Sequence, residues 1–220
     1  MIEGLEGERI KYLNRQAEKQ LPDQHEHTLQ ITSYGGCGTT LLYRFFSEHG
    51  VYTPPAVDDW YPWKHMLAPP PDDKVKEGFR AVYVYADPFN ATLSVFRRGF
   101  QHELVRRMAR DTSGWNTDWE LGDFLSEGTD YFRLTEQYRK WTEAERSYPI
   151  LLLKYESMWE YLPELMTYVG LPKATADSFP EKRPRSSSWQ DEPEEVQEKL
   201  EAIYGDLHNE IWDAPEFRIV

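Results

Sequence analysis

The sequence predicts a single α/β domain built on a central parallel β-sheet flanked by helices, and three observations lead to this prediction. Short runs of apolar, β-branched and aromatic residues at 28–34, 80–86 and 149–155 indicate three buried strands. Segments with apolar residues at helical spacing lie between these runs, and strands that alternate with helices are typical of a parallel sheet. The 220 residues are 40% hydrophobic and 15% aromatic, so one domain can bury a sizeable core.

The first part of the chain predicts a strand, a turn and a helix. Residues 1–27 are charged and weakly periodic, and we expect an N-terminal extension made of a helix and a loop. The strand over 28–34 leads through a glycine-rich turn to a helix over 39–49. One side of this helix carries its apolar residues, Leu41, Leu42, Phe45 and Phe46.

The middle of the chain predicts a long loop, a second strand and a broken helix. Residues 51–78 are rich in Pro, Trp and Asp, and an ordered loop of this length inside a compact domain is usually functional. Pro88 follows the strand over 80–86. Because proline favours the first position of a helix, we expect a helix to begin there. We expect this helix to cover 89–110, with a break at Gly99.

The last part of the chain predicts two helices around the third strand. A helix over 130–146 precedes the strand at 149–155. A further helix over 156–169 should end where Gly170 and Pro172 follow, since both residues stop helices.

Composition narrows the classes of function and location. We expect one domain over 1–220, in which 191–220 form an acidic C-terminal helix and tail. The net charge of −13 argues against a nucleic-acid partner, so an anionic ligand needs a local positive site. No apolar run approaches the ~20 residues of a membrane span, and the N-terminus lacks the apolar core of a signal peptide. Cys37 is the only cysteine, and the six histidines form no ligand-spaced cluster, so neither a disulfide nor a metal is expected. These features indicate a soluble cytoplasmic protein without membrane attachment.

The turn after the first strand has the character of an anion site. Its glycines, Gly35, Gly36 and Gly38, let the backbone bend and bring its N–H groups close to a ligand. The following helix offers free N–H groups, and Thr39 and Thr40 add hydroxyls. The alternative is a tight strand-to-helix connection with no ligand. A nucleotide-triphosphatase loop needs Gly-x4-Gly-Lys-Ser/Thr, which is missing here, and this argues against ATP or GTP hydrolysis.

Four segments, in order, resemble the sulfotransferases that use 3′-phosphoadenosine 5′-phosphosulfate (PAPS). The loop Tyr-Gly-Gly-Cys-Gly-Thr-Thr at 34–40 is similar to the family's 5′-phosphate loop. Trp-Lys-His-Met-Leu-Ala-Pro at 63–69 resembles the segment that carries the family's catalytic histidine. Ala-Asp-Pro at 86–88, with Ser94 at the family's spacing, resembles the 3′-phosphate segment. The fourth segment, Leu-Leu-Leu-Lys-Tyr-Glu-Ser at 151–157, resembles a family strand of the type Leu-Leu-Leu-Arg-Tyr-Glu-Asp, and it leads into a helix that ends in Val-Gly-Leu-Pro.

The resemblance, which spans roughly 28–210, implies a reaction and a set of site residues. A sulfuryl group moves from PAPS to a hydroxyl or amine of a small-molecule or glycan acceptor, with no metal. His65 is the implied base. The residues expected to bind the donor are Gly35, Gly36, Cys37, Gly38, Thr39, Thr40, Ser94, Arg183 and Arg185.

Two positions depart from the family pattern and leave alternatives open. Gly36 stands where the family has its loop lysine, and Ala86 where it has the strand-end arginine. Lys64, next to His65, is the expected replacement for the lysine. Other cations near the motifs also stay open as replacements, with a solvated surface charge as the plain alternative: Arg44, Arg97, Arg98, Arg183 and Arg185. The alternative function is a catalytically degenerate, sulfotransferase-like nucleotide-binding module, and a third is another nucleotide-handling enzyme such as a kinase with an atypical loop.

Three secondary assignments complete the analysis. His102 is a reserve candidate for the base. Trp60, Tyr61 and Trp63 either line an acceptor pocket or pack in the core. The basic stretch 97–110 either faces an anionic ligand or forms a solvated helix face.

Overall fold

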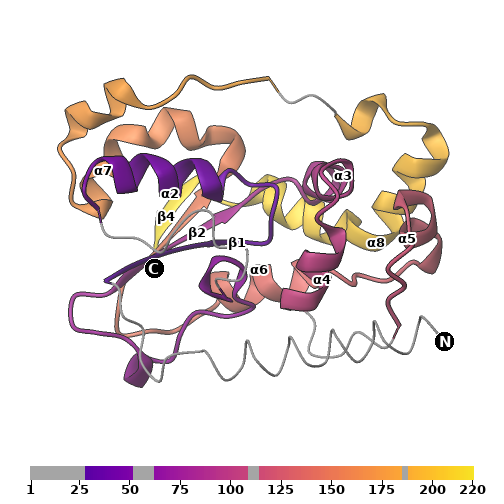
Figure 1. Ribbon diagram of the computed structural model, residues 1–220, viewed down its shortest axis with the longest axis horizontal. Coiled ribbons are helices and arrows are strands. Elements are labelled where there is room, and N and C mark those ends of the chain that lie inside the picture. The colour runs from indigo at the N-terminus through magenta and orange to yellow at the C-terminus, as the bar shows by residue number, and fades with distance from the viewer. Residues whose placement is uncertain (1–27, 52–61, 109–113, 185–187) are drawn as a thin grey trace.

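A mostly parallel four-stranded sheet forms the centre of the protein in its computed structural model, which describes residues 28–51, 62–108, 114–184 and 188–220 (Figure 1). The strands lie in the order β1 (Leu29–Ser33), β2 (Arg80–Tyr85), β3 (Ile150–Lys154) and β4 (Phe217–Ile219). The first three strands are parallel and β4 pairs antiparallel with β3. The predicted α/β class with a central sheet flanked by helices is therefore confirmed, with an antiparallel edge strand added.

Seven α-helices among the described residues surround the sheet: α2 (Thr39–Glu48), α3 (Pro88–Arg97), α4 (Gln101–Met108), α5 (Leu121–Glu127), α6 (Leu134–Thr142), α7 (Leu162–Val169) and α8 (Glu194–Asp213). In Figure 1, α2 and α7 lie above the sheet and α6 lies below it. Helices α3, α5 and α8 contact one another beside the sheet. The short 3-10 helix η1 (Pro62–His65) packs against β1.

The strands are covered on both faces, which explains their continuous apolar character. Every residue of β1 is buried, as is every residue of β2 after Arg80. The register pairs Ser33 with Val84 and Val84 with Leu153, so the carboxyl ends of the three parallel strands meet at one edge. Parallel α/β sheets bind ligands outside this edge, and the glycine turn lies there.

Two expected helices are shorter than the sequence analysis suggested. The helix expected over 130–146 begins only at Leu134, because Asp130 accepts hydrogen bonds from the N–H groups of Leu134 and Thr135 and so caps it. The segment expected to be helical over 156–169 starts as the 3-10 helix η3 (Tyr155–Tyr161), and α7 follows it.

Three predicted helix boundaries are confirmed, and two elements were not predicted. The break at Gly99 is confirmed, because Gly99 has a φ of 70° between α3 and α4. Pro88 begins α3 and Gly170 ends α7, both as expected. The sequence analysis missed α5 and β4. The expected extension over 1–27 and residues 52–61 of the long loop lie outside the described residues.

The described end of the long loop is fixed against the third-strand region. The guanidinium of Arg146 donates hydrogen bonds to the carbonyl oxygens of Pro69 and Pro70 at 3.2 and 3.0 Å. Asp72 accepts from both the N–H and the hydroxyl of Ser147. Within the described part of the chain, no helix combines the length and the apolar character that crossing a bilayer requires.

Candidate active site

The glycine turn between β1 and α2 has a backbone that only glycine adopts easily. Gly35, Gly36 and Gly38 have φ values of 98°, 71° and 73°, in the left-handed region. A Cβ on Gly38 would lie 2.7 Å from Cε2 of Tyr155, so a side chain there must displace the ring. The turn therefore needs glycine at position 38 both for its backbone angle and for the close approach of η3.

Two side chains of the turn point into the core. The Tyr34 hydroxyl accepts a hydrogen bond from the Ala86 N–H at 2.8 Å and donates one to the Ala86 carbonyl, joining the ends of β1 and β2. Burial raises the pKa of Tyr34 well above its usual range, so it stays a neutral donor. The Cys37 thiol is buried and donates to the Gly35 carbonyl at 3.0 Å. Cys37, which was expected to bind the donor, is thus a fully buried core residue that does not line the cavity.

The two departures from the family pattern have local structural reasons. A Cβ on Gly36 would lie 3.3 Å from Cα and O of Ala91 and 3.5 Å from Cβ of Ser94, so a side chain at position 36 meets α3. Ala86 is fully buried, and a longer side chain there would have to displace core neighbours. Neither position offers an easy site for a cation in this fold.

Lys64 brings an ammonium group to the glycine turn from a different segment. It lies in η1, and its Nζ donates a hydrogen bond to Oγ1 of Thr40 at 2.8 Å. Its side chain is only 7% exposed. The ammonium therefore lies at the first turn of α2, where the N-terminal end of a helix already favours negative charge.

His65 is held as a neutral ring with a defined tautomer. Its Nδ1 lies 2.7 Å from the Ser33 carbonyl oxygen, which can only accept, so Nδ1 carries the proton and Nε2 keeps a lone pair. Burial is the main cause that lowers the pKa of His65, to about 3, and the cations Arg107, Lys64 and Arg98 lower it further. The Ser33 hydrogen bond opposes this shift only in part, so His65 is an uncharged imidazole.

A buried network fixes the chain just after His65. Nε2 of Gln137 and Nε1 of Trp141 both donate to the Met66 carbonyl oxygen, at 2.6 and 3.0 Å. Trp141 is fully buried and stacks on Tyr83 of β2 with ring centroids 5.2 Å apart. The Lys64–His65 segment is therefore anchored by β1 on one side and by α6 on the other.

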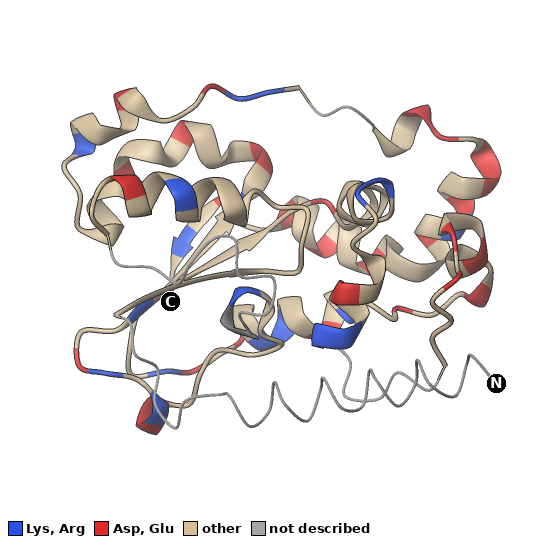
Figure 2. Cartoon of the chain, in the orientation of Figure 1, with Lys and Arg blue, Asp and Glu red and all other residues tan. Residues whose placement is uncertain are grey.

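A cavity of about 370 Å³ lies over the turn, and the glycines of the turn, Lys64 and His65 all line it. Its lining among the described residues is Gly35, Gly36, Gly38, Thr39, Thr40, Arg44, Lys64, His65, Val95, Arg98, Phe100, Glu103, Leu104 and Arg107. Four of these are basic and one is acidic, although the chain as a whole is strongly acidic. Figure 2 shows basic residues on α2, η1 and α4 around this region, whereas acidic residues gather on α5 and α8.

Several expected site residues lie elsewhere. Ser94 is buried beside Gly36 and does not line the cavity, and Arg183 is exposed in the segment after α7, away from the lining. Nδ1 of His102 accepts a hydrogen bond from Nε1 of Trp115 at 3.0 Å, so the reserve base packs outside the cavity. Arg185, Trp60, Tyr61 and Arg110, together with the Trp63 side chain, lie outside what the structure describes.

The sequence analysis left open whether the basic stretch 97–110 faces an anionic ligand, and one face of α4 lines the cavity. Phe100, Glu103, Leu104 and Arg107 line the cavity together. Their positions i, i+3, i+4 and i+7 place them on one side of a helix. The sequence shows this helical spacing. The mixture of apolar and charged residues at these positions, however, does not distinguish a cavity wall from a solvated helix face.

Compared with known proteins, the chain has no significant match to a family model, a curated protein or a solved structure. Among the described residues, no group of three or more His, Cys, Asp or Glu side chains is placed to hold a metal ion. The function of the cavity must therefore be argued from its own residues.

Proposed function

We propose that this protein is a sulfotransferase that moves a sulfuryl group from PAPS to a hydroxyl or amine of a small-molecule or glycan acceptor. One observation carries the proposal. The Lys64 ammonium rests on Thr40 of the glycine turn, and the next residue, His65, lines the same cavity with an unprotonated Nε2. An anion-binding turn, a cation and a neutral base in one cavity are the parts that this reaction needs.

The turn and Lys64 suit the donor end of the reaction. Backbone N–H groups at the start of α2 bind phosphate, and the Lys64 ammonium neutralises the charge that develops on the oxygen between phosphate and sulfate. In the resembling family a lysine inside the loop has this role. Here Gly36 faces α3, so we assign the role to Lys64, which reaches the turn from η1.

His65 suits the acceptor end. The acceptor oxygen attacks sulfur, the bond from sulfur to the phosphate oxygen breaks, and the acceptor proton passes to Nε2 of His65. Adenosine 3′,5′-bisphosphate leaves with the electron pair of the broken bond. A pKa of about 3 makes His65 by itself a weak base. A bound anionic donor offsets the fields of Arg107 and Lys64 and raises this pKa, so basicity appears when the donor is present.

The low pKa of His65 also favours a second candidate, the catalytically degenerate nucleotide-binding module. If donor binding does not restore the basicity of His65, the same cavity binds the nucleotide without turnover. The two candidates share a binding site and differ only in transfer.

Transfer of labelled sulfate from PAPS across a panel of hydroxyl and amine acceptors tests the proposal. We expect His65→Ala to lower turnover by about 10²–10⁴-fold while adenosine 3′,5′-bisphosphate still binds. His102→Ala is the matched control, because it removes a histidine whose ring contacts Trp115 outside the cavity. Wild-type turnover in the His65→Ala protein would refute the mechanism. Bisphosphate binding by wild type without transfer to any acceptor would support the binding module instead.

A further inference from the structure

Glu103 is the single acidic residue among the described residues that line the cavity. It lies on α4 directly before Leu104, whose side chain is 3.6 Å from where a Cβ on Gly35 of the turn would lie. The Oε2 atom of Glu103 is buried and accepts no hydrogen bond from a described residue. A buried carboxylate oxygen without a partner costs free energy, so such an oxygen at a cavity suits a hydrogen-bond donor that a ligand supplies.

A role for Glu103 as the counterion of a neighbouring base does not account for its carboxylate. Arg107 follows Glu103 by four positions on α4, and residues at this spacing can pair across one helical turn. Lys199 and Glu195 form such a pair on α8, at 2.7 Å. Glu103, by contrast, forms no ion pair with any described residue. Its carboxylate is therefore available to a ligand in the cavity.

The acidic groups of the donor suit the basic residues of the cavity and not Glu103. PAPS carries a 5′-phosphate, a sulfate and a 3′-phosphate, and the 3′-phosphate alone holds about two negative charges. The basic residues of the lining match these three groups, even where a basic residue also has a partner in the protein: Arg44, Lys64, Arg98 and Arg107. A carboxylate repels all three groups. Only the neutral N–H and O–H groups of the adenosine are alternative partners on the donor, and the variants below test them.

We propose, on the basis of the function proposed above, that the acceptor is a hydroxylated amine whose ammonium group binds the carboxylate of Glu103 and whose hydroxyl takes the sulfate. An ammonium supplies N–H donors and the opposite charge, and a carboxylate forms its strongest hydrogen bonds with such groups. Because Glu103 and His65 line the same cavity, a molecule held by its ammonium can present its hydroxyl to Nε2 of His65.

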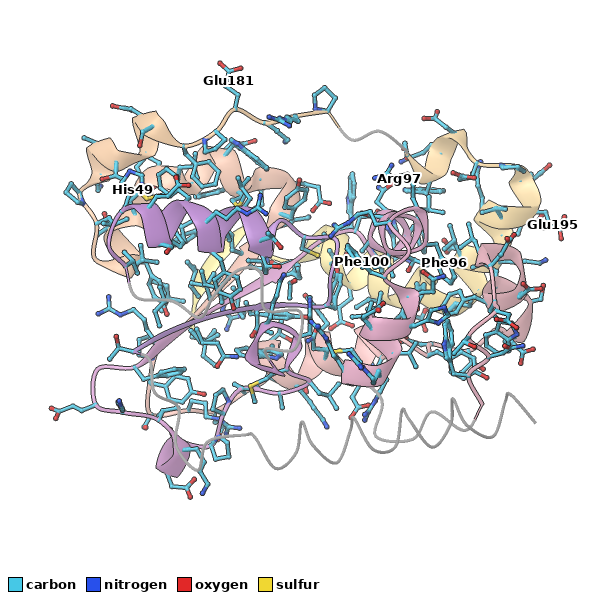
Figure 3. All side chains as sticks on the ribbon, in the orientation of Figure 1. His49, Phe96, Arg97, Phe100, Glu181 and Glu195 are labelled. Carbon is cyan, nitrogen blue, oxygen red and sulfur yellow. The ribbon has the colours of Figure 1, made fainter. Side chains whose placement is uncertain are left out.

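Phe100 offers a surface for the body of such an acceptor. It lies three positions before Glu103, so both side chains are on one side of α4 and its preceding turn, and both line the cavity (Figure 3). The Arg98 guanidinium covers one face of the ring, 4.8 Å from the centroid, and the residue is still 42% exposed. An aromatic or sugar ring between the ammonium and the hydroxyl can pack on this apolar surface.

The electrostatic field of the cavity makes capture of the amine depend on the donor. Arg107, Lys64 and Arg98 all lower the pKa of His65, so the field in this part of the cavity favours anions. This field opposes an ammonium until the phosphates and the sulfate of the donor offset it. We therefore expect the donor to bind before the acceptor. Each should strengthen the binding of the other, because the coupling between two bound ligands is reciprocal.

Matched pairs of small molecules test the inference by binding, without any need for transfer. The probes are tyramine against tyrosol, and methyl glucosaminide against methyl glucoside, and each pair differs by an ammonium in place of a hydroxyl. Calorimetry on the full chain measures their affinities with and without saturating adenosine 3′,5′-bisphosphate. With bisphosphate, at least one amine should bind about tenfold or more tightly than its neutral partner, and without it the preference should be lost. The pair that shows the preference identifies an aromatic or a sugar acceptor.

Variants locate the preference. Glu103→Gln keeps the size of the side chain and removes its charge, so it should lower the amine preference severalfold and leave bisphosphate affinity unchanged or slightly higher. Unchanged bisphosphate affinity also shows that the variant is folded. Glu127→Gln is the control, because it removes the same charge from an exposed position of α5 outside the cavity, and it should behave as wild type.

Three results would overturn the inference: equal affinity for amine and neutral probes with bisphosphate bound, an amine preference that Glu103→Gln leaves intact, or weaker bisphosphate binding in Glu103→Gln, which would assign the carboxylate to the adenosine. Failure of bisphosphate to bind wild type would count against the proposed function, and inorganic pyrophosphate then replaces it in the same titrations. An amine preference that depends on pyrophosphate and on Glu103 would support the inference alone, and its absence would overturn both.

Discussion

Donor binding should raise the pKa of His65, and a Coulomb estimate gives the size of the effect. Burial is the main cause that lowers this pKa from 6.5 to about 3, and Arg107, Lys64 and Arg98 lower it further. At pH 5.5 the ring is then about 0.3% protonated, against about 90% for an ordinary histidine. A bound anion removes part of the cationic field, whereas burial remains.

A Coulomb argument gives the expected shift. One negative charge about 6 Å from the ring, at an effective dielectric constant of about 20, contributes about 2.8 kcal/mol, or about two pKa units. With one such charge of adenosine 3′,5′-bisphosphate near the ring, we expect the pKa of His65 to rise to about 5. About a quarter of the molecules then carry the proton at pH 5.5.

Proton NMR of the histidine Cε1–H groups measures this directly. The His65 resonance, assigned with His65→Gln, should not titrate between pH 4.5 and 7 in the free protein and should begin to titrate on adding bisphosphate. His49 is an internal control, because it is exposed at the C-terminal end of α2 (Figure 3) and does not line the cavity. A free-protein pKa near 6.5, or a pKa that saturating bisphosphate leaves unchanged, would refute the reasoning.

Three further results are expected from the turn and from His65. Gly38→Ala and Gly50→Ala should both destabilise the protein by about 1–2 kcal/mol, because both glycines have a left-handed backbone. Only the new Cβ at position 38 meets Tyr155, so urea unfolding should show the larger loss of stability for Gly38→Ala. Gly36→Lys should lower both stability and bisphosphate affinity, because its side chain meets α3 at a positive φ; a gain in transfer activity would contradict this. Native His65 stays neutral while the unfolded chain binds a proton below pH 6.5, so stability should fall by about 1.4 kcal/mol per pH unit below that value. The fall in stability should be shallower in His65→Gln. Identical profiles of stability against pH in the two proteins would show that the pKa of His65 is not lowered in the folded state.

The sequence predicted the parts of the fold that depend on local patterns. The three parallel strands, the turn and the break at Gly99 follow from buried runs and from glycine and proline positions. The strand β4 escaped detection because its three residues are held by pairing with β3, a tertiary contact with no local signature. The N–H of Glu120 donates to Asp123 at the start of helix α5, but Glu-x-x-Asp is not the usual Ser/Thr-x-x-Glu/Gln capping pattern, so the sequence did not mark this helix.

The candidate site was predictable only in part for the same reason. The motif placed Lys64 beside His65, but the contact of Lys64 with Thr40 depends on how η1 packs against β1. The anchors Gln137 and Trp141 reach Met66 from a distant helix, and no sequence spacing marks them. The inward orientation of Cys37 likewise follows from the positive φ angles of the glycines around it, which the residue type alone does not reveal.

The contact between Lys64 and the glycine turn is the centre of the account, and calorimetric titration with adenosine 3′,5′-bisphosphate tests it most directly. Wild type should bind one bisphosphate per chain. Lys64→Met, which keeps the length of the side chain and removes its charge, should weaken binding by about 1.5–3 kcal/mol, roughly 10- to 150-fold. Lys74→Met, an exposed position of η2 (Asp72–Lys74) outside the cavity, should bind as wild type does. No binding by wild type, or equal affinity in wild type and Lys64→Met, would contradict the account.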